Sequence, residues 1–202
     1  MDFVKEFSIF LHENKIIQFG DFTLASGKKS PYYVDLRLVS SYPHQFRNMV
    51  KYLQNEIIKD IGLDKFDSLV SVPTGGLVIA SALAIETVKP LIYVRSKPKD
   101  YGTSKSIEGK VWEGLKAVMI DDVATTGGSV VNGIKSLMEA KIKVTDAYVI
   151  VNRMEGAEEA LKKQGVTLHA LSNIIQITKS LHEHNLVEDE VLQKVQEQVG
   201  IK

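Results

Sequence analysis

The segment VMIDDVATTGGSV, from Val118 to Val130, is the most informative part of the chain about its fold. The run at 115–120, which overlaps its start, is short and apolar and is followed by turn residues, which is typical of a buried strand. Residues 129–140 have apolar side chains at helical spacing. These side chains are Val130, Val131, Ile134, Leu137 and Met138. The intervening TTGGS is therefore predicted to be a strand-to-helix turn.

A turn of this kind favours binding of a phosphate group. It directs unpaired backbone N–H groups and the positive end of the helix dipole at whatever lies in front of it, and glycines let an anion approach the backbone closely. An exposed helix dipole contributes only ~0.3 to 1 kcal/mol. The hydroxyls of Thr125, Thr126 and Ser129 are therefore expected to add hydrogen bonds to the phosphate.

Asp121 and Asp122 precede this turn, at the carboxyl end of a strand, where open α/β sheets bind ligands. Two carboxylates repel a nearby phosphate unless a sugar diol or a metal ion lies between them and it. An isolated pair of aspartates is more simply explained as a helix N-cap. The whole string favours a binding site, because a cap requires one acid and no pair of glycines. A nucleotide triphosphatase is disfavoured, because the chain lacks a G-x-x-x-x-G-K-[ST] loop.

The rest of the chain alternates between strand-like and helix-like patterns. Further strands are expected at 16–24, 32–39, 68–72, 91–95, 144–151 and 167–171. Further helices are expected near the N-terminus and at 43–61, 76–87, 156–164 and 188–199. This alternation predicts an α/β fold with a parallel sheet flanked by helices, formed by residues 1–202 as a single domain.

Composition limits the classes of function. The formal net charge is zero and basic residues form no long run, which argues against a nucleic-acid or membrane-surface partner. The chain has no cysteine, so thiol chemistry is excluded, and a cytoplasmic location is compatible with this. The most apolar window, 69–88, contains Pro73 and two glycines and is not expected to span a membrane. The five histidines lack metal-binding spacing, so no metal site made by the protein is predicted.

Residues 96–113 interrupt the alternation. The segment is polar, contains four lysines and begins directly after a strand, on the same edge as Asp121. Unstructured segments of this length in compact domains are usually lids or disordered tails. A lysine-rich lid over a polyanionic substrate is favoured over a solvated surface loop or a hairpin.

The string at 118–130 resembles the 5-phosphoribosyl 1-pyrophosphate signature of the type I phosphoribosyltransferases. Other segments are similar to the orotate phosphoribosyltransferase branch of that family. They are FGDFTLASGKKSPYYVDLR (19–37), SVPTGG (71–76), RSKPKDYG (95–102), VNRMEG (151–156) and ITKSL (177–181). The resemblance implies the type I phosphoribosyltransferase fold, with residues 1–40 as a small N-terminal hood over the base. It also implies that 96–113 is a mobile catalytic loop that reaches the neighbouring subunit's site, and hence a homodimer.

The implied reaction transfers the phosphoribosyl group of 5-phosphoribosyl 1-pyrophosphate to orotate, which gives orotidine 5′-monophosphate and pyrophosphate in pyrimidine biosynthesis. The resemblance implies catalytic roles for Lys99, Asp121 and Asp122. It implies that phosphoribosyl pyrophosphate is bound by Thr74, Gly75, Arg95, Lys99, Tyr101, Asp121, Asp122, Val123, Ala124, Thr125, Thr126, Gly127, Gly128 and Ser129. Thr125 and Arg153 are expected to bind orotate, and Mg²⁺ is expected to arrive mainly with the pyrophosphate.

Several positions depart from the family pattern. Ala25, Ser96 and Gly75 stand where many relatives have basic residues. The substitutes considered for the missing cations are Lys28, Lys29, Lys97 and Lys105. For Arg153 alone, a surface ion pair with Glu155 or Glu158 is the simpler interpretation. Two other functions stay open, a non-catalytic sensor of phosphoribosyl pyrophosphate and a purine phosphoribosyltransferase.

Overall fold

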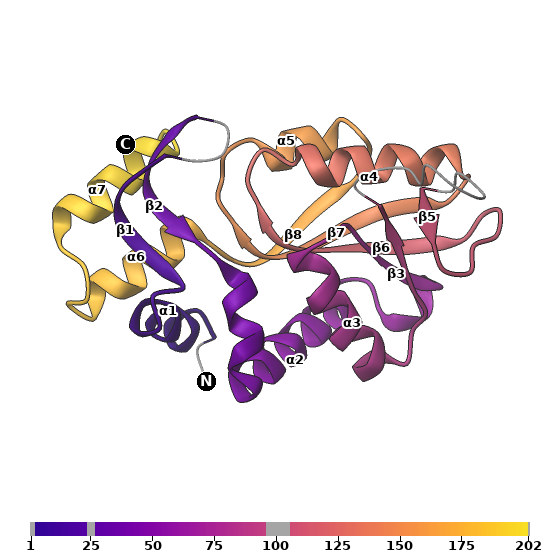
Figure 1. The fold of residues 1–202 in the computed structure, drawn as a ribbon, viewed down its shortest axis with the longest axis horizontal. Helices are drawn as coiled ribbons and strands as arrows, with labels where there is room; N and C mark the ends of the chain where they lie inside the picture. The colour runs from indigo at the N-terminus through magenta and orange to yellow at the C-terminus, as the bar shows by residue number, and fades with distance from the viewer. Residues whose placement is uncertain (1–2, 24–26, 96–105, 202) are drawn as a thin grey trace.

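The structure is a computed structural model that describes residues 3–23, 27–95 and 106–201. A six-stranded mixed sheet lies at its centre, with the strand order β5-β4-β3-β6-β7-β8 (Figure 1). The strands are β3 (Ser68–Ser71), β4 (Leu91–Val94), β5 (Ile107–Glu108), β6 (Lys116–Ala124), β7 (Lys143–Asn152) and β8 (Thr167–Asn173). Neighbouring strands are parallel except β4 and β5, which are antiparallel. The predicted parallel sheet is thus confirmed apart from its edge strand β5, which lies in the segment expected to be a loop.

Helices cover both faces of this sheet (Figure 1). On one face lie α2 (Pro43–Asp60) and α3 (Gly75–Thr87), and on the other lie α4 (Gly128–Glu139) and α5 (Ala157–Lys162). Side chains of β6 alternate between the two sides, because successive residues of a strand point to opposite faces. Val118 and Ile120 pack in the core on the α2–α3 side, whereas Ala117 and Met119 pack in the core on the α4–α5 side. The central strand is therefore buried on both faces, as its continuous apolar run predicted.

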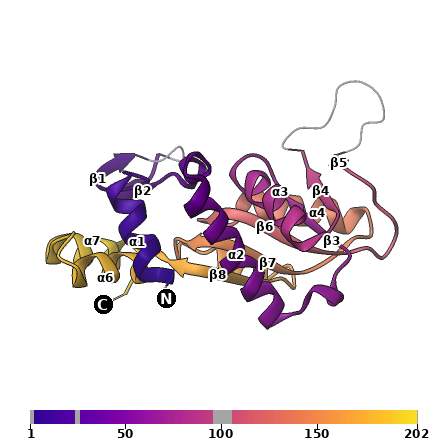
Figure 2. The same cartoon turned by 90° about the horizontal axis from the view of Figure 1, so that it is seen from below.

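A smaller layer lies at one end of the molecule (Figures 1 and 2). It contains α1 (Phe3–Glu13), the antiparallel pair β1 (Ile17–Thr23) and β2 (Lys29–Val34), α6 (Ile174–Glu183) and α7 (Asp189–Gln198). Here the expected strand at 32–39 is wrong in its second half. Residues Leu36–Ser41 form a 3₁₀ helix, η1, because the Asp35 carboxylate accepts a hydrogen bond from the Arg37 N–H and caps it. A second short 3₁₀ helix, η2, covers Leu63–Lys65.

The order of the strands identifies where a ligand can bind. From β3 the chain passes through α3 to β4 on one side, and later returns to β6 on the other side of β3. Ligands of open α/β sheets bind beyond the carboxyl ends of the strands at such a switch point. Within the three described ranges, no helix is both long enough and apolar enough to cross a membrane.

Candidate active site

The predicted site residues that the structure describes gather at one edge of the sheet. Arg95 follows β4, the turn at 72–74 follows β3, the segment 121–129 contains the end of β6, and Arg153 follows β7. The pairing register brings Ser71 beside Ile120 and Ala124 beside Asn152, so these strand ends are neighbours. The Arg153 N–H also donates to the Ala124 carbonyl at 2.8 Å. Segments that are far apart in the sequence therefore surround one site.

Asp121 and Asp122 extend β6 and do not cap a helix, so the N-cap alternative is wrong. Asp121 is buried, with 8% of its surface exposed, whereas Asp122 is only half-buried. Burial, and secondly the charge of Asp122, raise the pKa of Asp121 from its ordinary value of 3.8 to about 8. The backbone N–H groups of Asp122 and Gly76 donate to this carboxylate and oppose the rise. A carboxyl with a raised pKa beside a second carboxyl is typical of functional sites.

The N-terminus of α3 lies directly against these two acids because it begins with two glycines. A Cβ atom at Gly75 would lie 1.9 Å from an Asp122 carboxylate oxygen, and a Cβ atom at Gly76 would lie 2.4 Å from one of Asp121. The glycine at 75, where some relatives have lysine, thus has a local cause in this structure. A side chain there would displace Asp122. The helix N-terminus also places positive dipole charge beside the acids.

The TTGGS turn has the predicted form. α4 begins at Gly128, and its N-cap Gly127 has a φ of 78°, in the left-handed region that favours glycine. A Cβ atom at Gly127 would lie 3.2 Å from the Ala157 Cα, so α5 approaches the turn closely. Among the described residues, the hydroxyls of Thr125, Thr126 and Ser129 have no hydrogen-bond partner, which leaves them available to a ligand.

Of the two cationic side chains predicted to bind pyrophosphate, Arg95 and Lys99, the structure describes only Arg95. Arg95 forms an ion pair with Glu108 of β5, with 2.7 Å between Nε and Oε1. The predicted residues Lys99 and Tyr101, together with Ala25 and Ser96, lie outside the described residues.

Arg153 is buried in a polar cluster between the central sheet and β2. Its Nε and Nη2 atoms lie 3.0 and 2.9 Å from Glu155 Oε1, and Nη2 donates to Ser30 Oγ at 3.2 Å. The guanidinium carbon lies 4.5 Å from the centre of the Tyr32 ring. Lys28 Nζ donates to the other Glu155 oxygen at 2.8 Å. The ion pair with Glu155 that the sequence left open is present, but it is buried and does not lie on the surface.

The ionisation of this cluster follows from its contacts. Burial raises the pKa of Glu155, but hydrogen bonds and charges from Lys28 and Arg153 outweigh it and lower the pKa overall. Burial raises the pKa of Tyr32, so its hydroxyl stays protonated and donates to Glu155 Oε1 at 3.1 Å. Glu155 is therefore held as a carboxylate, and Tyr32 is held as a neutral donor beside it.

The sequence did not identify Ser30 and Tyr32 as partners of Arg153. It also did not identify Gly76, whose missing side chain leaves room for Asp121. Arg37 was missed too, although its guanidinium is close enough to Asp122 for the two charges to interact. The adjacent small residues at 75–76 were a usable signal for a close approach. Contacts between residues 123 positions apart, such as Ser30 and Arg153, leave no local signal.

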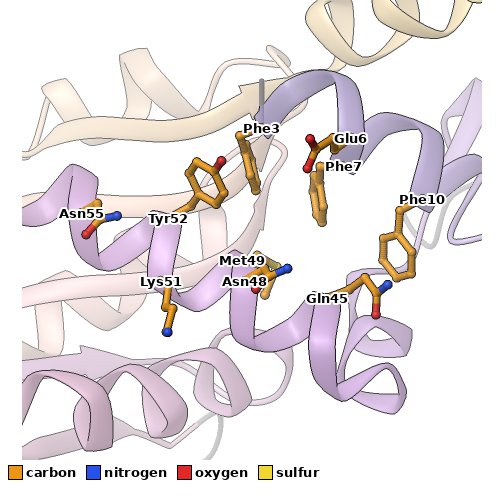
Figure 3. Close-up of a pocket in the computed structure, with 10 residues that line it drawn as sticks. All are labelled: Phe3, Glu6, Phe7, Phe10, Gln45, Asn48, Met49, Lys51, Tyr52 and Asn55. Carbon is orange, nitrogen blue, oxygen red and sulfur yellow. The ribbon is translucent and has the colours of Figure 1, made fainter. Parts of the chain in front are cut away.

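A separate hollow of about 440 Å³ lies between α1 and α2 (Figure 3). Its lining includes the aromatic side chains of Phe3, Phe7, Phe10 and Tyr52. It contains none of the predicted site residues. The strand ends therefore form the candidate active site.

Comparison with known proteins points to one family. The phosphoribosyl transferase domain matches residues 43–181. A protein of Cenarchaeum symbiosum named orotate phosphoribosyltransferase is 52% identical over 97% of this chain and 98% of its own length. The structure of orotate phosphoribosyltransferase from Aeropyrum pernix covers 90% of this chain and 99% of its own, with a TM-score of 0.75 and 32% identity. The structure of Leishmania donovani UMP synthase matches 98% of this chain with a TM-score of 0.85 and 31% identity, and this chain spans 43% of that protein.

Proposed function

This chain belongs to the phosphoribosyl transferase family, and we propose that it transfers the phosphoribosyl group of 5-phosphoribosyl 1-pyrophosphate to orotate, in the synthesis of pyrimidine nucleotides. The products are orotidine 5′-monophosphate and pyrophosphate. The observation that carries the proposal is the acidic pair at the end of β6, followed directly by the TTGGS turn at the N-terminus of α4. This arrangement has acceptors for a sugar diol beside donors for its phosphate.

In this proposal, the turn at 125–129 binds the 5′-phosphate through backbone N–H groups and free hydroxyls. Asp121 and Asp122 accept hydrogen bonds from the ribose hydroxyls. Loss of pyrophosphate leaves positive charge on the ribose ring, and carboxylates fixed beside it stabilise that charge. Because no protein nucleophile is required, positioning and electrostatics supply most of the rate. The two neighbouring carboxyl groups then stabilise the cation that forms as pyrophosphate leaves.

Pyrophosphate is proposed to bind Thr74, Gly75, Arg95, Lys99 and Tyr101. Mg²⁺ favours one or two carboxylates together with substrate phosphates. The donors here fit that pattern, because the half-buried Asp122 lies at the end of β6, beside the turn that is proposed to bind the substrate. The metal would arrive mainly with the pyrophosphate and would neutralise its charge, and Asp122 would hold it from the protein side.

Orotate is proposed to bind Thr125 and Arg153, under β1 and β2 as a hood formed within residues 1–40. Arg153 has a planar guanidinium that matches a carboxylate. Residues 96–113, in which β5 pairs with β4 of the same chain, are proposed to reach the neighbouring subunit's site through the part that precedes β5 and to exclude water, which competes for the cation. A cytoplasmic location completes the proposal.

A homodimer is supported by the exposed side of α3. The helix is apolar nearly all round, and helices of this kind are normally buried. Yet Ile85 and Val88 at its C-terminal end are 80% and 89% exposed. We expect Ile85→Lys to shift the protein from dimer to monomer in sedimentation, while Lys135→Glu on α4 does not. An unchanged sedimentation coefficient for Ile85→Lys would place the interface elsewhere.

The activity is tested by the fall in orotate absorbance with phosphoribosyl pyrophosphate and Mg²⁺, measured beside adenine, hypoxanthine and uracil. Turnover with orotate alone is expected. The variant with both Asp121→Asn and Asp122→Asn is the control, and we expect its kcat to fall by about a hundredfold or more. Turnover with adenine or hypoxanthine would show that the protein acts on a purine base. Binding of phosphoribosyl pyrophosphate without turnover of any base would favour the sensor function.

A further inference from the structure

We propose that Glu155 is a positioning residue for the base, which fixes the Arg153 guanidinium and is itself held by Lys28. This inference rests on the proposed function, because it concerns how the same site selects an anionic base. Neither composition nor motif spacing gave Glu155 a part in the reaction.

The first observation is the direction in which the guanidinium is held. Its Nε donates a hydrogen bond to Glu155 Oε1, and its Nη2 forms an ion pair with the same oxygen at 2.9 Å. The Tyr32 ring covers one face of the guanidinium, and Ser30 Oγ accepts from Nη2. The Tyr32 hydroxyl also interacts with the guanidinium, and Nη1, which neither Glu155 nor Ser30 engages, is the donor offered to a base. Glu155 thereby selects which edge of Arg153 faces the ligand.

The second observation is burial. The side chains of Arg153 and Glu155 are only 6% and 4% exposed. A guanidinium in such a place loses most of its rotamer freedom, and the contacts of Nε and Nη2 with Glu155 Oε1 hold it in one orientation. A base that meets a fixed donor does not have to order the arginine when it binds. Preorganisation of this kind increases affinity without any additional contact.

The third observation is the balance of charge. Arg153 and Glu155 alone would be a neutral pair with little attraction for an anion. Lys28 adds a second cation, 2.8 Å from Glu155, and gives the three side chains a net charge of +1. The carboxylate of orotate matches this excess, whereas uracil has no carboxylate. Lys28 thus supplies the positive charge that Ala25 lacks, and it does so through Glu155.

The fourth observation is the location of the partners. Arg153 and Glu155 follow β7 of the central sheet, whereas Lys28, Ser30 and Tyr32 belong to β2 or directly precede it. The charge cluster therefore joins the two layers of the molecule beside the phosphate turn. Arg153 is positioned by both layers at once.

The test is steady-state kinetics with Glu155→Gln. Glutamine keeps the size and one acceptor for Arg153, but it loses the charge and turns an amide N–H₂ toward Lys28. We expect the KM for orotate to rise about tenfold, because Arg153 loses the ion pair that orients it, and this loss outweighs the increase in net charge from +1 to +2. The KM for phosphoribosyl pyrophosphate should stay within about twofold. A purely structural role would lower the fraction of active enzyme, and hence kcat, without a selective change in one KM.

Lys28→Met is the second variant, because Lys28 is half-exposed, and its circular dichroism spectrum should match that of the wild type. We expect the orotate KM to rise about threefold in the wild-type background and not at all in the Glu155→Gln background, since Lys28 acts through Glu155. Glu158→Gln is the matched control, since Glu158 is an exposed acid three residues further along the chain. It should leave both KM values unchanged.

The outcomes separate the two proposals. If the wild-type protein does not turn over orotate, the proposed function fails before any variant is measured. If it does turn over orotate and both Glu155→Gln and Lys28→Met keep the wild-type orotate KM, the positioning role is overturned. Equal increases in both KM values would also overturn it, because the effect would not be specific to the base.

Discussion

Replacing Asp121 by asparagine should make the free protein more stable at pH 8 and leave its stability unchanged at pH 4. Asp121 is buried at the end of β6 with Asp122 beside it, and these two causes raise its pKa to about 8. In the unfolded chain the same carboxyl loses its proton near pH 4. Between pH 4 and pH 8 the folded state therefore holds a proton that the unfolded state has released. Stability falls as the pH rises through this window and levels off above pH 8.

The size of the effect follows from the same pKa. Each pKa unit corresponds to ~1.4 kcal/mol, so a rise from 3.8 to about 8 sets an upper limit of roughly 6 kcal/mol. Water that enters the open edge of the sheet and the shared titration with Asp122 reduce this value. We expect about 2 to 3 kcal/mol of extra stability for Asp121→Asn at pH 8. For a chain of this size that is a rise in Tm of roughly 4 to 12 °C.

The assay is urea unfolding followed by circular dichroism at several pH values from 4 to 8, at one protein concentration and without substrate. The quantity compared is the variant's free energy of unfolding minus that of the wild type, so that other titrating groups cancel. Glu139→Gln, which removes an exposed acid at the end of α4, is the control and should give a difference near zero at every pH. If the Asp121→Asn difference is the same at pH 4 and pH 8, Asp121 is already ionised in the free protein and the reasoning from burial is refuted.

Three further substitutions test individual contacts. Gly75→Ala places a Cβ atom 1.9 Å from an Asp122 oxygen, so we expect kcat to fall about tenfold. The Tm should change little, since the Asp122 side chain can rotate away. A wild-type kcat would show that catalysis does not require Asp122 in its present position. Gly127→Ala forces alanine to a φ of 78° and against the Ala157 backbone, so thermal unfolding should show a loss of about 1 to 3 kcal/mol in stability. Kinetics should also show a higher KM for phosphoribosyl pyrophosphate. An unchanged Tm would contradict the turn geometry. Asn173→Ala removes the capping box with Gln176 at the start of α6 and should lower the free energy of unfolding by about 1 kcal/mol without changing either KM; a selective KM change would mean that α6 contributes to the site.

Local pattern predicted the parts of the fold whose cause is local. The segment at 115–140 gave a strand, a glycine turn and a helix, because a buried strand and an amphipathic helix each leave their own apolar period in the sequence. α6 was not predicted as a separate helix, although Asn173 and Gln176 have the spacing of a capping box. The 3₁₀ helix η1 was read as a strand because Leu36 and Val39 are apolar, and only the Asp35 cap distinguishes the two structures.

The sequence predicted only part of the candidate site. Residues that follow strand ends of a parallel sheet must meet at one edge, so the sequence order was enough to place the segment after 91–95 beside Asp121, whereas Arg153 was assigned from the resemblance. The contacts that surround Arg153 were not predictable, because Ser30, Tyr32 and Lys28 approach from a layer whose position depends on long-range packing. The burial of Asp121 had the same origin, since it requires Gly76, in the first turn of α3, to lie against the strand end.

Asp121 is buried and Asp122 is only half-buried, so the two acids should lower the free energy of unfolding by different amounts. Burial is the larger cause of the raised pKa of Asp121 and the charge of Asp122 the smaller one, so removing the charge of Asp122 relieves only the smaller part. Asp122→Asn should therefore lower kcat strongly but raise the free energy of unfolding at pH 8 by less than Asp121→Asn does, by about 1 kcal/mol or less. When replacing a buried acid by its neutral isostere raises the free energy of unfolding, the acid is typically one that is kept for catalysis. If the two variants gain the same stability at pH 8, repulsion between the carboxylates, and not burial, dominates the site.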